Sequence, residues 1–118
     1  KRLVACITDG ISGMGLPDGT YTYNNREYTS INGLARYLDG TLIGSTMGLG
    51  KISANFIKFT GAGFREAIDC VSINPARILG IDKYKGSIEA GKDADIVIID
   101  ENFNVKYTII SGRTIYQN

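Results

Sequence analysis

Leu3-Val4-Ala5-Cys6-Ile7, followed by Thr8-Asp9-Gly10, is the stretch of sequence that decides the fold. Its five apolar residues lack the alternation of polar and apolar positions that marks a half-exposed strand. Such a run is typical of a strand covered on both faces, as in parallel sheets and barrels. A strand of this kind needs a neighbour on each side, and nothing upstream in the sequence supplies one. The sequence therefore predicts the C-terminal part of a longer α/β fold.

Asp9 directly follows this predicted strand, at its C-terminal end. In a parallel barrel the corresponding end carries the active site, which makes Asp9 a candidate catalytic carboxylate. The alternative is a turn residue, because Asp before Gly commonly begins a turn. The local sequence by itself favours the turn. The glycine-rich run over residues 10–15 adds support for the catalytic interpretation, because glycines allow a substrate to approach the backbone closely.

The rest of the chain reads as a β-rich part, then helices, then a second set of strands. Short β-like runs at residues 21–23 and 27–31 are separated by Asn24-Asn25, and Asn32-Gly33 favours a hairpin turn. Residues 40–50 are predicted to form a glycine-rich loop. The elements expected after it are helices over residues 52–59 and 64–71, a short helix from its N-cap Asn74 through Pro75 to Gly80, and strands over residues 96–99, 105–111 and 113–116.

Composition bounds the class of protein. The chain has 118 residues, of which 43% are hydrophobic, and a formal net charge of +1, which suits one domain or part of one. The balanced, scattered charge argues against nucleic acid and acidic membranes as partners. No apolar run approaches the roughly 20 residues of a membrane span. We expect a cytoplasmic protein in which Cys6 and Cys70 are reduced and buried.

Several motifs are excluded by what they lack. Histidine is absent, so these residues cannot build a usual catalytic zinc site or a Ser-His-Asp arrangement. Residues 86–92 (GSIEAGK) nearly match a phosphate-binding loop, but Asp93 replaces the required Ser or Thr and a strand pattern follows instead of a helix. A turn connection is predicted there. Asp93 and Asp95 lack calcium-loop spacing and are predicted to be solvated turn residues.

Four stretches, spread over nearly the whole chain, resemble one family. They are residues 7–10 with 15–19 (ITDG and GLPDG), residues 39–45 (DGTLIGS), residues 72–77 (SINPAR), and residues 85–88 with 91–95 (KGSI and GKDAD). Together they are similar to the C-terminal portion of the N-acetylglucosamine-6-phosphate deacetylases, a family of the amidohydrolase superfamily. The last two stretches occur across many amidohydrolases. The first two, in this order and spacing, point to the deacetylases.

The resemblance implies a distorted (β/α)8 TIM barrel beside a small β-sandwich. Residues 1–81 would be the C-terminal end of the barrel, with its last strand at residues 1–9, a substrate loop and closing helices. Residues 82–118 would be strands of the sandwich. The resemblance also implies a divalent metal ion, zinc or iron, whose glutamate and histidine ligands lie upstream and not in this chain. A homodimer is implied for the full-length parent, and exposed strand edges favour self-association of the isolated chain.

The resemblance also assigns roles to individual residues. Asp9 matches the family's catalytic aspartate, and Leu42, Ile43 and Gly44 match the loop that contacts the sugar, where Ile43 is often Ala or Ser. The implied reaction is metal-dependent hydrolysis of N-acetylglucosamine 6-phosphate to glucosamine 6-phosphate and acetate by the full-length parent, with the isolated chain inert. Two alternatives stay open. One is another amidohydrolase, such as a cyclic amidase or deaminase, and the other is a non-catalytic β-rich structural or binding module.

Overall fold

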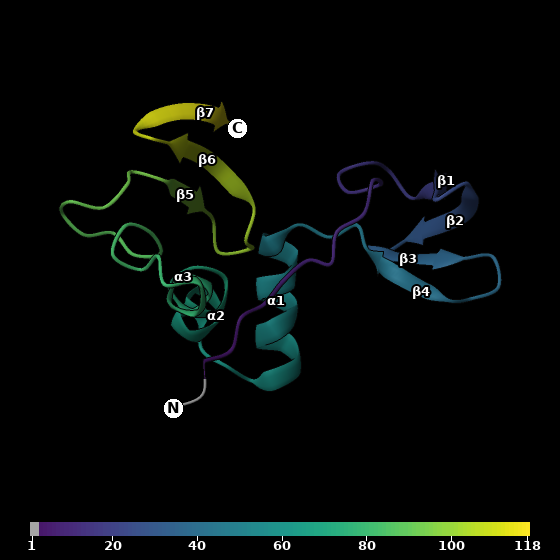
Figure 1. Cartoon of the computed structure of the whole chain (residues 1–118), viewed down its shortest axis with the longest axis horizontal. Coiled ribbons are helices and arrows are strands. Elements are labelled where there is room, and N and C mark those ends of the chain that lie inside the picture. The colour runs from purple at the N-terminus through teal and green to yellow at the C-terminus, as the bar shows by residue number, and fades with distance from the viewer. Residues whose placement is uncertain (1–2) are drawn as a thin grey trace. The chain divides into compact units, whose positions relative to one another are not determined.

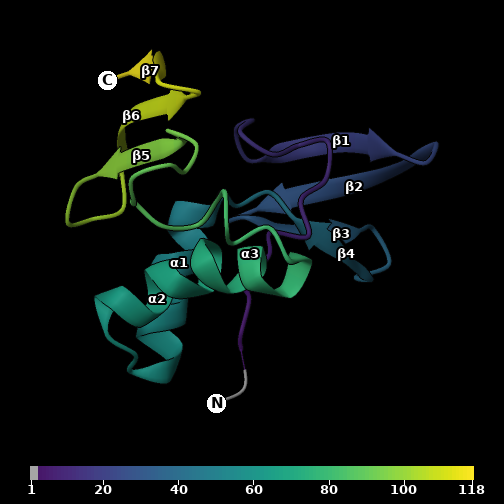
Figure 2. The same cartoon turned by 60° about the vertical axis from the view of Figure 1, so that its left-hand side comes forward.

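A computed structural model describes residues 3–118, which form seven strands and three helices (Figures 1 and 2). In chain order these are β1 (Gly19–Tyr23), β2 (Arg26–Ile31), β3 (Leu34–Tyr37), β4 (Leu42–Ser45), α1 (Leu49–Thr60), α2 (Phe64–Val71), α3 (Ile73–Leu79), β5 (Ile96–Ile99), β6 (Val105–Ile110) and β7 (Arg113–Gln117). The strands pair in two antiparallel sheets, in the orders β1-β2-β3-β4 and β5-β6-β7. Within the described range, none of the helices has the length and apolar character that crossing a membrane requires.

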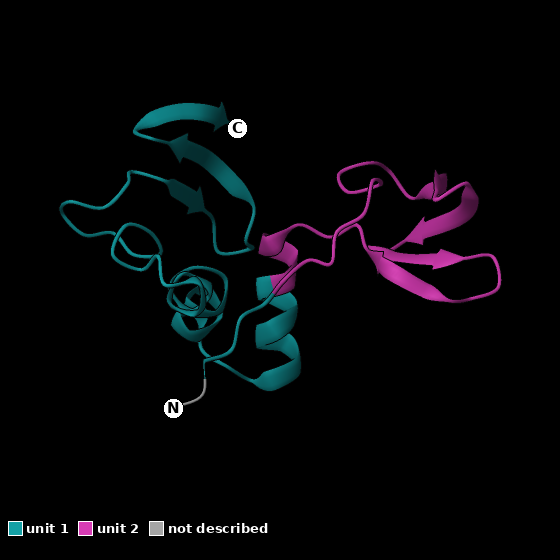
Figure 3. Cartoon of the chain, viewed as in Figure 1, with its two compact units in different colours: residues 1–6, 53–118 teal, residues 7–52 magenta. Residues whose placement is uncertain are grey.

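The chain divides into two compact units (Figure 3). One holds the described residues up to Cys6 together with Ser53–Asn118, and the other holds Ile7–Ile52. The division falls inside α1. Each unit is a part of the chain whose residues contact one another more than they contact the other part. The expected barrel part over residues 1–81 and sandwich part over residues 82–118 concern the intact protein, and this division stays a prediction.

The first sheet is a meander built on two asparagine turns. Asn24 and Asn25, between β1 and β2, both have positive φ, at 50° and 57°. Asn32 and Gly33, between β2 and β3, have φ of 52° and 81°. Turns with two positive φ values match the twist of a hairpin, and asparagine tolerates this conformation. The predicted hairpin turn at Asn32-Gly33 is therefore confirmed, and Asn24-Asn25 forms a second turn of the same kind. The core of this sheet is formed by fully buried residues, namely Tyr28, Ser30 and Ala35.

Residues 42–45, expected to lie in a loop, form β4 instead. Ala35 of β3 pairs with Gly44, and the register shifts between Ala35 and Arg36. This irregularity is a bulge, which a glycine inside a strand often accompanies. The sequence favoured a loop because glycines surround the segment. The strand forms because the segment pairs with β3, which the local sequence does not reveal.

The helices follow the expected order with one difference at a boundary. α1 and α2 include the predicted segments, and Gly80 ends α3 with φ of 71°, as a left-handed C-cap should. However, α3 begins at Ile73 after Ser72, so the prediction of Asn74 as the N-cap is wrong. The Asn74 amide instead donates a hydrogen bond to the carbonyl of Val4, at 2.9 Å. The Asn74 side chain therefore binds a residue far away in the sequence and does not cap the helix.

Residues 3–7 do not form the predicted strand. Their apolar side chains are largely exposed, at 45% for Leu3, 50% for Val4 and 76% for Ile7. None of the described strands pairs with this segment. A parallel strand is covered only when neighbouring strands and crossover helices pack on it. Because the described residues supply none for this segment, the prediction of a covered strand is wrong for the chain by itself.

Cys6 and Cys70 are both free thiols, and only Cys70 is fully buried. The backbone N–H of Cys6 donates to the carbonyl of Cys70 at 2.8 Å, which brings the two residues together. Partial burial raises the pKa of the Cys6 thiol, and the neighbouring Cys70 raises it further. A raised pKa favours the protonated thiol over the reactive thiolate.

Candidate functional site

The segment around Asp9 lies along the free edge of β4. Gly10 and Ser45 form a parallel bridge. The Ser45 N–H donates to the carbonyl of Asp9 at 2.8 Å, and the Ile11 N–H donates to the carbonyl of Ser45 at 3.1 Å. Because the antiparallel pairing with β3 uses one edge of β4, the other edge is available to this segment. Asp9 and the strand that contains Leu42, Ile43 and Gly44 are thus neighbours in space.

Asp9 itself has a strained backbone. Its φ is 46°, in the left-handed region. Asp9 is an exposed residue. A residue other than glycine held in this region costs about 1–3 kcal/mol, and aspartate is among the residues that tolerate it best. Such a conformation persists only where the surrounding structure fixes it. For Asp9 the fixing contacts come from Ser45.

Gly44 lies directly against Asp9. It is buried and has φ of 142°. A Cβ at this position would stand 2.6 Å from the carbonyl oxygen of Asp9, 2.9 Å from Cγ2 of Ile11 and 3.6 Å from Oδ2 of Asp9. Any side chain here would therefore collide with the backbone of Asp9. The carboxylate of Asp9 therefore lies close to the backbone of Gly44, with no side chain of residue 44 between them.

Leu42 and Ile43 complete the set that the sequence singled out. Leu42 is exposed and Ile43 is half-buried, so the strand offers apolar surface next to Gly44. The structure therefore brings all four predicted site residues to one edge of the first sheet. Sequence reasoning missed Ser45, although it directly follows Gly44 in the quoted stretch. Only its nonlocal hydrogen bonds to residues 8–11 reveal its place in the site.

Comparison with known proteins shows the family of this chain. The model of the amidohydrolase family matches residues 16–115. The chain belongs to the amidohydrolase family. This amidohydrolase chain is similar to N-acetylglucosamine-6-phosphate deacetylase from Homo sapiens, with 35% identity over 94% of this chain and 27% of the relative. It is also similar to N-acetylgalactosamine-6-phosphate deacetylase from Escherichia coli O157:H7, with 36% identity over 96% of this chain and 30% of the relative.

A solved structure supports the same relationship. The crystal structure of N-acetylglucosamine-6-phosphate deacetylase from Thermotoga maritima matches with a TM-score of 0.84 and 38% identity, over 98% of this chain and 31% of that one. The resemblance inferred from the four stretches of sequence is thus confirmed. The amidohydrolase chain spans 27% of the length of the human relative.

The amidohydrolase chain does not itself fit a metal centre. It contains no histidine. Across residues 3–118, no three side chains of His, Cys, Asp or Glu lie close enough together to hold a metal ion. A single carboxylate such as Asp9 does not make such a site.

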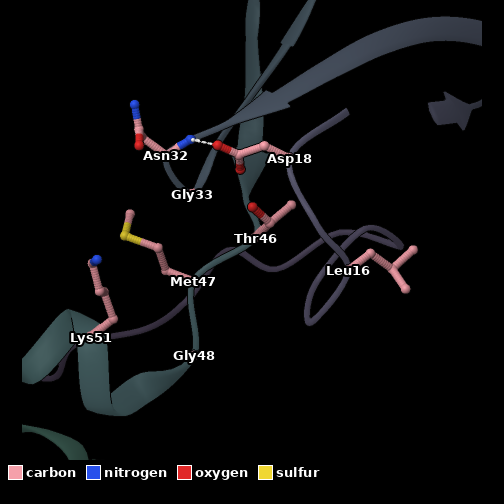
Figure 4. A pocket seen from close by; sticks show the side chains of 8 residues that line it. All are labelled: Leu16, Asp18, Asn32, Gly33, Thr46, Met47, Gly48 and Lys51. Atoms are coloured by element: carbon pink, nitrogen blue, oxygen red, sulfur yellow. Dashed lines mark hydrogen bonds between the residues drawn. The ribbon is translucent and has the colours of Figure 1, made fainter. Parts of the chain in front are cut away.

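A pocket of about 340 Å³ lies elsewhere in the same unit as Asp9 (Figure 4). Its walls come from the loop before β1, the turn between β2 and β3, the connection between β4 and α1, and the first turn of α1. The lining residues are Leu16, Asp18, Asn32, Gly33, Thr46, Met47, Gly48 and Lys51. The N–H of Asn32 donates to Oδ2 of Asp18 at 2.9 Å, drawn as the dashed line in Figure 4. Neither Asp9 nor residues 42–44 line this pocket. It is therefore separate from the predicted site.

Lys92, the lysine of the near-match to a phosphate loop, is engaged inside the chain. Its Nζ donates to the carbonyl of Asp82 at 2.6 Å and to Oγ of Ser87 at 2.5 Å, and it pairs with Glu89 at 3.4 Å. Its side chain is only 11% exposed. The next element after this segment is strand β5, whereas a phosphate loop would be followed by a helix. The prediction of a turn connection, and not a phosphate loop, is confirmed.

Lys92→Met should lower the stability of the intact protein by about 1–3 kcal/mol, because it leaves the carbonyl of Asp82 and the hydroxyl of Ser87 without a charged donor. Thermal unfolding measures the loss as a lower midpoint. Lys83→Met is the matched control, since Lys83 is an exposed lysine of the same segment and surface changes usually stay within about 0.5 kcal/mol. Equal midpoints for the two variants would show that the hydrogen bonds of Lys92 carry no stability.

Asp93 and Asp95 are partly exposed, as expected of turn residues, but both pair with Lys85. The hydrogen bonds that Lys85 donates to Asp93 and to Asp95 raise the pKa of Lys85, with Asp93 the larger cause. The pKa of Asp95 is lowered, first by Lys85 and then by the N–H of Ser111, which Asp95 accepts at 2.8 Å. Asp95 therefore joins the connection before β5 to the turn between β6 and β7.

Proposed function

We propose that the intact protein is a deacetylase that hydrolyses N-acetylglucosamine 6-phosphate to glucosamine 6-phosphate and acetate. The observation that supports this most directly is the contact between Asp9 and Gly44. The sequence motifs gave these residues separate roles, one as the catalytic carboxylate and one in the substrate loop. A shared site requires that they lie together. The human and Thermotoga relatives are N-acetylglucosamine-6-phosphate deacetylases, and they suggest the substrate class.

The remaining parts of the proposal concern the intact protein. Residues 1–81 would end a (β/α)8 barrel, and residues 82–118 would contribute strands to a small sandwich domain. A divalent metal ion, zinc or iron, would be bound by residues outside these 118, because this chain fits no metal centre. Homodimerisation and a cytoplasmic location stay predictions.

Asp9 would act as the acid and base of the reaction. Hydrolysis of an amide requires that a water lose a proton as it attacks the carbonyl, and that the leaving nitrogen gain one. A single carboxylate can accept the first proton and donate it to the nitrogen. The bare backbone of Gly44 would let the acetamide approach this carboxylate. Leu42 and Ile43 would provide apolar surface for the acetyl group.

The test is an assay of the intact protein with N-acetylglucosamine 6-phosphate, in which released acetate and the new primary amine are measured. We expect equal amounts of both products. The 118-residue chain with added divalent metal is the control, and we expect it to be inactive because it fits no metal centre. Failure of the intact, metal-loaded protein to release acetate would overturn the proposal. Release of acetate by the chain alone would show that the site is complete within it.

A second substrate is favoured by one observation. The N-acetylgalactosamine-6-phosphate deacetylase from Escherichia coli O157:H7 is 36% identical, as close as the human relative at 35%. The two sugars differ in the orientation of the C4 hydroxyl. A site built to hydrogen-bond one hydroxyl can reject the other isomer strongly. The ratio of kcat/KM for the two sugars decides between them, and a preference for the galacto sugar would replace the substrate while keeping the reaction.

A further inference from the structure

Ser45 is bonded to the chain on both sides of Asp9. Its N–H donates to the carbonyl of Asp9 at 2.8 Å, and its carbonyl accepts the N–H of Ile11 at 3.1 Å. Its side-chain Oγ donates to the carbonyl of Thr8. Ser45 is buried, with 8% of its surface exposed. The peptide groups before and after Asp9 are thus both fixed by one residue.

Of these bonds, only the one to Thr8 depends on the side chain at position 45. The backbone bonds would form with any residue of the strand, whereas the hydroxyl is specific to Ser or Thr. The hydroxyl is also oriented, because Oγ accepts the N–H of Met47 at 3.4 Å while it donates to Thr8. The carbonyl of Thr8 belongs to the peptide that leads into Asp9. The φ of Asp9, 46°, is the rotation about the bond between its N and Cα, so a hydrogen bond that holds the Thr8–Asp9 peptide helps to hold this φ.

We infer that Ser45 is a positioning residue for Asp9, whose hydroxyl holds the Thr8–Asp9 peptide so that the carboxylate keeps one orientation beside Gly44. This inference rests on the proposed function. Ser45 acts through Asp9 and through no contact with the sugar. Loss of its hydroxyl should therefore affect the chemical step and leave substrate binding by residues 42–44 in place.

The test is steady-state kinetics of the intact protein carrying Ser45→Ala. We expect kcat to fall by about 10- to 100-fold, because misplacing a catalytic group by about 1 Å can cost roughly 100-fold. We expect KM to stay within about 3-fold, because the lost interaction belongs to the chemical step. A rise in KM with kcat unchanged would overturn the inference and place Ser45 in binding.

Ser30→Ala is the matched control for a purely structural effect. Ser30 is a buried serine of the same sheet, and its Oγ shares a hydrogen bond with Oγ1 of Thr46 at 2.8 Å. Both variants lose a hydrogen bond of a buried hydroxyl, so we expect similar falls in the unfolding midpoint. The Ser30 variant should keep kcat within about 2-fold of wild type. Equal kcat in the two variants would overturn the inference.

A second pair keeps the test decisive if Ser45→Ala folds poorly. Ser45→Thr and Ser45→Val have the same shape and differ in the hydroxyl. We expect the Thr variant to turn over at least about 10-fold faster than the Val variant, since only Thr can hold the peptide. Equal rates with an active wild type would overturn this inference alone. A wild type that releases no acetate would overturn the proposed function, and this inference with it.

Discussion

Asp9→Asn is expected to lower the deacetylation rate of the intact protein by roughly 10²–10⁴-fold, the contribution that a positioned acid or base typically makes. The amide of asparagine has the same shape as the carboxylate but cannot accept the proton of water. Asparagine also tolerates the left-handed φ of 46° found at Asp9, so the backbone should be preserved. Steady-state kinetics checks the rate, and thermal unfolding and metal content should stay close to those of wild type.

Asp39→Asn is the matched control for this prediction. Asp39 also precedes a glycine, and it accepts the N–H of Thr41 at 2.9 Å in an exposed turn. It thus represents the alternative interpretation of Asp9 as a turn residue. We expect the Asp39 variant to keep its rate within about 2-fold. If the two variants had equal rates, Asp9 would be a turn residue and another group would handle the proton.

Features of the fold that arise from neighbouring residues could be predicted from the sequence. The hairpin turn at Asn32-Gly33 and the helix end at Gly80 depend on a few local φ values, which asparagine and glycine permit. Features that depend on distant partners could not. β4 forms because Ala35 is available to pair with Gly44, and residues 3–7 lack such a partner in the described chain.

The candidate site shows the same division. The local sequence favoured a turn at Asp9, and only the resemblance to the deacetylases linked it to residues 42–44. Their contact in the structure agrees with that link but could not be derived from spacing. Ser45 was missed because a serine after a glycine carries no local signal. Its importance lies in hydrogen bonds to residues 8–11, which form only when the edge of β4 meets that segment.

Gly44→Ala is expected to reduce both stability and turnover. Two effects combine, since φ of 142° disfavours any side chain and the new Cβ would stand 2.6 Å from the carbonyl oxygen of Asp9. Overpacking of this kind costs about 1–3 kcal/mol. Asp9 cannot simply move away, because its carbonyl oxygen accepts the N–H of Ser45. The displacement should therefore reach the carboxylate, with a loss in kcat on the order of 100-fold.

Gly40→Ala separates the clash from backbone strain. Gly40 also has a positive φ, of 88°, but its Cβ would meet nothing within 4 Å. The control should lose only about 1–2 kcal/mol of stability from its left-handed conformation, with kcat near wild type. Unfolding midpoints and kcat measured on both variants check this. If Gly44→Ala matched Gly40→Ala in both measurements, the backbone of Asp9 would be free to adjust, and the position of the carboxylate would not depend on the close approach of Gly44.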